Sequence, residues 1–111
     1  MTLPLTGRPR FKLPSVATVG EVVEIRTLLE HPMETGLRKM PNGQPIARDF
    51  LASFVAEANG TPVLNVDFRN ATSANPYLIF HARISGPTVF RFVWTDEDGR
   101  SVDAVAHVDV K

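Results

Sequence analysis

The sequence predicts an all-β sandwich, and three observations carry that prediction. Apolar and polar residues alternate with a period of two in six segments, which is typical of strands with one buried face. Turn-forming residues separate these segments, with nine prolines and seven glycines among 111 residues. No segment shows the period of a convincing helix. About seven short antiparallel strands with turns between them indicate an immunoglobulin-like β-sandwich.

The first three predicted strands differ in how clearly they alternate. In the first, Phe11 and Leu13 share one face. The second lies in "EVVEIRTLLE" at 21–30, where the residues on the core side are Val23, Ile25, Thr27 and Leu29. The third, "DFLASFVAEA" at 49–58, is apolar on both faces, with Leu51 and Val55 opposite Phe50 and Phe54.

Four further strands alternate clearly. Their core-side residues are Leu64, Val66 and Phe68, then Leu78, Phe80, Ala82 and Ile84, then Phe90, Phe92 and Trp94, then Val102, Ala104, Ala106, Val108 and Val110. Asn59-Gly60 predicts a two-residue hairpin turn, because both central residues of such a turn have positive φ. "DEDG" at 96–99 predicts a second tight turn. We expect an N-terminal extension at 1–9 and one sandwich domain at 10–111.

Composition narrows the class of protein. Twelve basic residues balance twelve acidic ones and no run of like charges occurs, which argues against a nucleic-acid binder. No segment has the ~20 apolar residues of a membrane span, and the N-terminus has no apolar stretch of signal-peptide length. We therefore expect a soluble chain. The absence of cysteine excludes a disulfide or a thiol intermediate on this chain.

A long connection from Pro32 to about Arg48 carries no strand pattern, and such loops are often functional. It begins in "EHPMETG" at 30–36. His31 and Glu34 could act as acid and base there, but a catalytic pair needs a pocket that small sandwiches seldom enclose. The three histidines (the other two are His81 and His107) have no metal-ligand spacing. We expect no metal and no cofactor.

An interaction surface is better supported. Several large apolar residues occupy positions that alternation places outside, which suggests that something covers one sheet face. They are Leu28, Leu51, Val55, Tyr77 and Ile79. Met33, Leu37 and Met40 add apolar groups in the long loop, of a kind suited to a contact surface. Single exposed apolar residues are nevertheless normal, so the prediction rests on the group.

Three blocks of sequence, the first of them continued by the stretch that follows it, resemble a known family. They are "HPMETG" at 31–36, "LRKMPNGQPIARDF" after it, "SANPYLIF" at 73–80 and "FVWTDEDG" at 92–99. Over nearly the whole chain, from about Arg10 to Val110, the sequence resembles SoxZ, the small subunit of the SoxYZ sulfur carrier of bacterial thiosulfate oxidation. Met40-Pro41 departs from the charged residues more usual in that loop, which leaves the contacts of the loop open.

The resemblance implies a role as well as a fold. It implies a non-catalytic scaffold that forms a heterodimer with a cysteine-bearing SoxY subunit, on whose cysteine the sulfur intermediates are held. The pair presents them to the thiosulfate-oxidising enzymes, which dock transiently. The resemblance also implies action in the periplasm, with export alongside the partner subunit.

We expect the functional end of the sandwich to be a partner-binding or docking surface. Its residues are His31, Pro32, Met33, Glu34, Thr35, Gly36, Arg38, Ser73, Asn75 and Pro76. His31 and Arg38 could donate charge-assisted hydrogen bonds to an anionic thiosulfonate on the partner. The alternative is structural, with side-chain-to-backbone hydrogen bonds that close the loops.

Two other functions compete with the scaffold hypothesis. One is a generic immunoglobulin-like binding module that forms homodimers and has no sulfur role; an isolated scaffold with an uncovered apolar face could also self-associate. The other is a small hydrolase or lyase that uses His31 and Glu34, which the lack of a nucleophile disfavours.

Overall fold

The structure is a computed structural model that describes residue 5, residues 7–68 and residues 74–111. It confirms the all-β prediction. The strands are β1 (Arg8–Lys12), β2 (Val16–Ala17), β3 (Val22–Glu30), β4 (Leu51–Ala58), β5 (Thr61–Asp67), β6 (Tyr77–Arg83), β7 (Thr88–Asp96) and β8 (Ser101–Val110). Within the described ranges no helix has the length and apolar character needed to cross a membrane.

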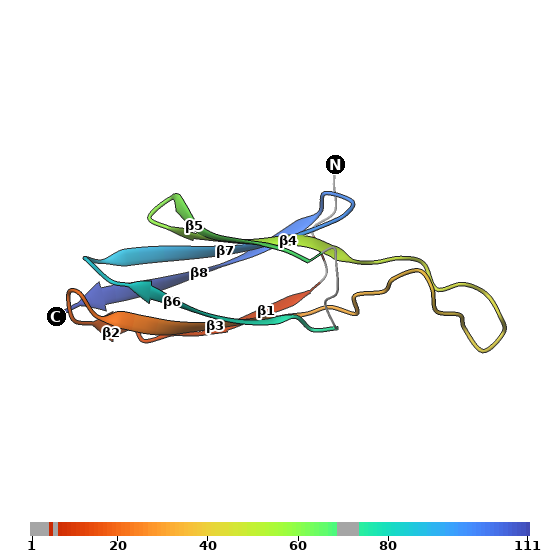
Figure 1. Cartoon of the computed structure of the whole chain (residues 1–111), viewed down its shortest axis with the longest axis horizontal. Helices are drawn as coiled ribbons and strands as arrows, with labels where there is room; N and C mark the ends of the chain where they lie inside the picture. The colour runs from red at the N-terminus through yellow and green to blue at the C-terminus, as the bar shows by residue number, and fades with distance from the viewer. Residues whose placement is uncertain (1–4, 6, 69–73) are drawn as a thin grey trace.

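The strands form two layers, as Figure 1 shows. One sheet has the order β1-β3-β6 and the other the order β2-β8-β7-β4-β5. The sequence predicted about seven strands, all antiparallel. The additional one is the two-residue β2, which pairs parallel with β8. A segment this short is too brief to show alternation, so its sequence carried no signal.

The core lies between the inner faces of the two sheets. The predicted inner face of β3 is confirmed, since Val23, Ile25, Thr27 and Leu29 are all buried. Phe54 from β4 lies at the centre of an aromatic cluster, with ring centroids 5.1 Å from Trp94 and 6.2 Å from both Phe80 and Phe92. Alternation predicted these positions well because each sheet buries only one of its faces.

Leu51 corrects one prediction. Alternation left it as a candidate for an exposed apolar surface, but its side chain is completely buried. The pairing of β4 with β7 shifts register between Leu51 and Ser53. Such a bulge places one extra residue on one strand and reverses which face the residues before it occupy. Leu51 therefore packs in the core and cannot contact a partner.

Both predicted tight turns are confirmed. Asn59 and Gly60 have φ of 50° and 84°, which is the conformation of a type I′ hairpin turn between β4 and β5. The turn between β7 and β8 is built around Asp96. Its buried carboxylate accepts hydrogen bonds from the backbone N–H of Asp98 at 3.0 Å and of Arg100 at 2.8 Å.

Candidate functional site

Residues 31–50 form an arm that projects from one end of the sandwich, between β3 and β4 (Figure 1). The chain has a radius of gyration of 16.3 Å, whereas about 13 Å is expected for a compact domain of this length. Antiparallel backbone hydrogen bonds hold the two limbs of the arm together, with Glu34 pairing reciprocally with Asp49 and Ile46 N bonding to Arg38 O. The loop predicted to lack strands is therefore an irregular hairpin.

Gly36 allows the two limbs to approach closely. Its φ is 86°, a conformation that L side chains rarely adopt. A Cβ added there would lie 3.2 Å from Cβ of Arg48 on the opposite limb. The glycine in "HPMETG" thus has a structural explanation.

His31 lies at the base of the arm and is buried, with 2% of its surface exposed. Its Nδ1 accepts a hydrogen bond from the backbone N–H of Met33 at 3.0 Å. The neutral ring therefore carries its proton on Nε2, which lies 3.3 Å from Oδ1 of Asp49. In this conformation the ring cannot donate to an anion at the surface, which corrects that hypothesis for His31.

The base of the arm is tied to the segment before β6. The backbone N–H of His31 donates to Oδ1 of Asn75 at 2.8 Å, and Asn75 N donates to His31 O at 2.8 Å. The structure thus brings together two of the sequence blocks that predicted the site. The first of these is a side-chain-to-backbone hydrogen bond of the kind that the structural alternative predicted, and the second joins two backbone groups.

Asn75 offers a test of this contact, because it also has a positive φ of 53°. Asn75→Ala should lower the free energy of unfolding by about 2–3 kcal/mol, since it leaves the His31 N–H unpaired and strains the backbone. Asn75→Gly loses only the hydrogen bond and should cost about 1 kcal/mol less. Urea denaturation measures both. Equal stability of the two variants and the parent chain would show that the contact contributes nothing.

A second set of contacts ties the arm to the β7–β8 turn. Arg48 donates to both carboxylate oxygens of Glu97, at 2.6 and 3.0 Å, and to the Thr35 carbonyl at 2.8 Å. Arg100 lies 3.4 Å from the Asp49 carboxylate and donates from Nε to Asp96 at 2.6 Å. Sequence reasoning named Thr35 as a docking residue but missed the other residues of this set, because partners such as Arg48 and Glu97 are 49 positions apart.

The exposed part of the arm carries an ion pair and isolated apolar groups. Arg38 donates two hydrogen bonds to Glu34, at 2.5 and 3.0 Å. These bonds lower the pKa of Glu34 below its ordinary value, so the contribution of the pair to stability is lost as the pH falls through the carboxyl range. Leu37 is 86% exposed, and Met40 near the tip is also exposed.

The predicted docking residues divide into two groups. Pro32, Thr35, Arg38 and Asn75 are exposed, with Glu34 and Gly36 half-buried. His31, Met33 and Pro76 are buried. Met33 therefore does not supply the flexible contact group expected of it. Ser73 lies outside the described residues.

The predicted apolar interface does not form one patch. Leu28, Tyr77 and Ile79 lie together on the outer face of the three-stranded sheet, since Leu28 pairs with Tyr77 and Ile79 pairs with Arg26. Val55 lies on the outer face of the other sheet and pairs with Asn65 and Val93. Leu51 is in the core. Three of the five residues thus remain candidates for a shared contact surface.

The arrangement gives little support to acid–base chemistry. His31 contacts Met33 and Asp49, whereas the Glu34 carboxylate is held by Arg38. Each side chain is therefore occupied by a different partner. No group of three or more metal-ligating side chains occurs in the described part of the chain.

The fold and the arm define a β-sandwich protein whose exposed sheet faces and projecting arm are surfaces for contact with other molecules. A family model described as "Sulphur oxidation protein SoxZ" matches residues 11–107. The chain belongs to the SoxZ family, which is a non-catalytic part of the Sox sulfur-oxidation system. No curated protein sequence matches the chain.

Several solved structures with similar folds are distant in sequence. The sulfur carrier protein SoxY from Chlorobium limicola f thiosulfatophilum is 15% identical with a TM-score of 0.63, covering 92% of this chain and 74% of that one. A superoxide reductase (neelaredoxin) from Ignicoccus hospitalis is 12% identical with a TM-score of 0.69, covering 95% of this chain and 82% of that one. These likenesses support the sandwich fold alone.

Proposed function

We propose that this chain is the non-catalytic scaffold subunit of a heterodimeric sulfur carrier. Its partner in this proposal is a cysteine-bearing SoxY subunit. The pair presents sulfur intermediates, bound to the partner's cysteine, to the enzymes of thiosulfate oxidation. The observation that carries the proposal is the SoxZ family match over residues 11–107 in a chain without cysteine. A covalent carrier needs a thiol, so the thiol must belong to another chain.

The lack of cysteine also suits the scaffold role chemically. A thiolate near the carrier cysteine could attack a sulfur–sulfur bond in the cargo and discharge it. A subunit without thiols removes that side reaction. The proposal therefore accounts for a feature of the sequence that neither the fold nor its stability requires.

The arm supports a role in transient docking to the pathway enzymes. Its exposed residues include Pro32, Thr35, Leu37 and Arg38. The arm as a whole projects beyond the sandwich (Figure 1). An exposed leucine on a projecting hairpin is suited to insert into a groove of another protein. Because the family resemblance implies it, we also propose that the chain acts in the periplasm and is exported together with its partner.

The first experiment measures mass in solution. The chain is analysed by size exclusion with light scattering, alone and mixed with its cognate cysteine-bearing subunit. We expect a stable one-to-one complex. A chain that stays a monomer or a homodimer after mixing would contradict the scaffold role and favour the generic binding module. Turnover of thiosulfate by the chain alone would contradict the non-catalytic role.

A further inference from the structure

The two outer faces of the sandwich carry opposite charge, although the chain as a whole is neutral. The register places five cations on the outer face of the three-stranded sheet, against the carboxylates of Glu24 and Glu30. These cations are Arg8, Arg10, Lys12, Arg26 and Arg83. The strands of the five-stranded sheet place one cation, Arg91, on their outer face. Four carboxylates share that face with it, those of Glu57, Asp67, Asp103 and Asp109.

The cation of the five-stranded sheet is already paired. Arg91 donates from Nε to Asp103 at 2.9 Å and from Nη1 to Glu57 at 3.3 Å. These contacts join three neighbouring strands, and they pair the arginine with two carboxylates of its own face. On the three-stranded sheet Arg10 pairs with Glu30 and Arg26 pairs with Glu24, but Lys12 has no ion-pair partner within the described ranges. Positive charge on that face is thus left in excess.

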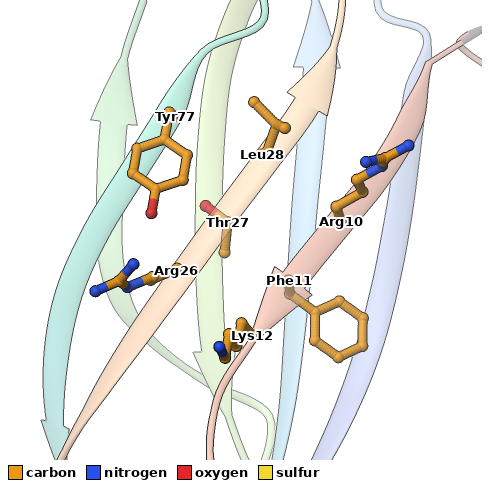
Figure 2. Close-up of a pocket in the computed structure, with 7 residues that line it drawn as sticks. All are labelled: Arg10, Phe11, Lys12, Arg26, Thr27, Leu28 and Tyr77. Carbon is orange, nitrogen blue, oxygen red and sulfur yellow. The ribbon is translucent and has the colours of Figure 1, made fainter.

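The same face has a hollow with an apolar surface. It has a volume of about 230 Å³, and Leu28 and Tyr77 line it together with Arg10, Lys12 and Arg26 (Figure 2). Directly paired residues form two rows across the three strands, Arg10–Leu28–Tyr77 and Lys12–Arg26–Ile79. Large apolar groups therefore lie beside cations at the centre of an exposed sheet. An aromatic and aliphatic centre beside arginines is the composition of a protein interface.

We infer that this cationic face binds the partner subunit through an acidic and aliphatic surface on that partner. The inference rests on the proposed scaffold function and names the face of the sandwich that binds the partner. Charge complementarity selects the occupant: carboxylates of the partner would meet Arg10, Lys12 and Arg26, and an aliphatic side chain would enter the hollow. The opposite face, with its carboxylates in excess, would repel the same partner and remain in solvent.

A pair of matched variants tests the choice of face. Ile79 and Val105 are similarly exposed, at 51% and 48%, and lie within strands on opposite outer faces. Ile79→Asp should weaken the Kd for the cognate subunit by more than about 100-fold, because it places a carboxylate against an acidic and desolvated contact. Val105→Asp should change the Kd by less than about 3-fold. Titration calorimetry gives the affinities, and thermal melting followed by circular dichroism checks that both variants fold.

Lys12→Glu is an independent test that leaves the apolar groups in place. It should weaken binding about 10-fold and reduce the dependence of the affinity on salt, since exposed charges act through screened attraction. If neither Ile79→Asp nor Lys12→Glu changes the affinity, the inference about this face is overturned, while the proposed heterodimer still stands. The same holds if Val105→Asp weakens binding more than Ile79→Asp does.

Failure of the proposed function gives a different result. If the parent chain forms no complex with its cognate subunit, both the scaffold function and the inference fail. If Ile79→Asp instead converts a homodimer of the isolated chain into monomers, while no mixed complex forms, the face is a self-association surface. That outcome also overturns the inference.

Discussion

Phe54→Ala should lower the free energy of unfolding by about 3–5 kcal/mol, the range for removal of a buried aromatic side chain. Phe54 is completely buried and contacts aromatic rings from both sheets, Phe80 on β6 and Trp94 on β7. Its removal opens a cavity where the two layers meet. A domain of this size is stable by about 5–15 kcal/mol, so the variant would lose a large fraction of its stability.

Phe11→Ala provides the matched control. Phe11 also contacts the aromatic cluster, with its ring centroid 5.8 Å from that of Phe92, but it is 41% exposed at the edge of the sheet. We expect a loss of only about 1 kcal/mol for this variant, since less apolar area returns to water. Urea denaturation followed by Trp94 fluorescence measures both. Similar losses for the two variants would show that Phe54 is not the centre of the core.

His31→Ala should lower the free energy of unfolding by about 2–4 kcal/mol, because it leaves a cavity under the arm and removes the acceptor of the Met33 N–H. It also removes the contact of Nε2 with Asp49, through which the arm is linked to Arg100. Denaturation measures the stability, and limited proteolysis measures whether the arm is loosened.

Arg38→Ala is the control for His31, because Arg38 belongs to the same predicted docking surface and is exposed. It should leave the melting temperature nearly unchanged, since an exposed ion pair contributes little. If the arm docks enzymes, turnover by the reconstituted pathway should fall for Arg38→Ala. Unchanged melting for His31→Ala, together with lost turnover, would contradict the structural role and restore the direct role for this histidine.

The buried position of His31 changes how the "HPMETG" block is understood. Its histidine, methionine and glycine set the conformation of the arm, through Nδ1 of His31, the positive φ of Met33 and the close approach at Gly36. Proline and threonine of the block stay exposed. The block therefore combines a structural part with a part available for contacts, and the predicted docking role now rests on Pro32, Thr35 and Arg38.

The amino-acid sequence by itself determined the fold class, the inner faces of the alternating strands and the two tight turns. These features depend on local rules, since a period of two places every second residue on one face and Asn-Gly favours positive φ. The burial of Leu51 could not be predicted from such local rules. A bulge depends on the register with β7, a distant segment of the chain, and one shifted residue reverses the face.

Only the tertiary structure decided which groups meet. It placed Asn75 against His31, Arg48 against Glu97 and Tyr77 beside Leu28. It also separated the charges of a neutral chain onto opposite outer faces, which composition cannot show because composition counts charges without placing them. Contacts between distant segments follow from the pairing of whole sheets, and no local pattern specifies that pairing.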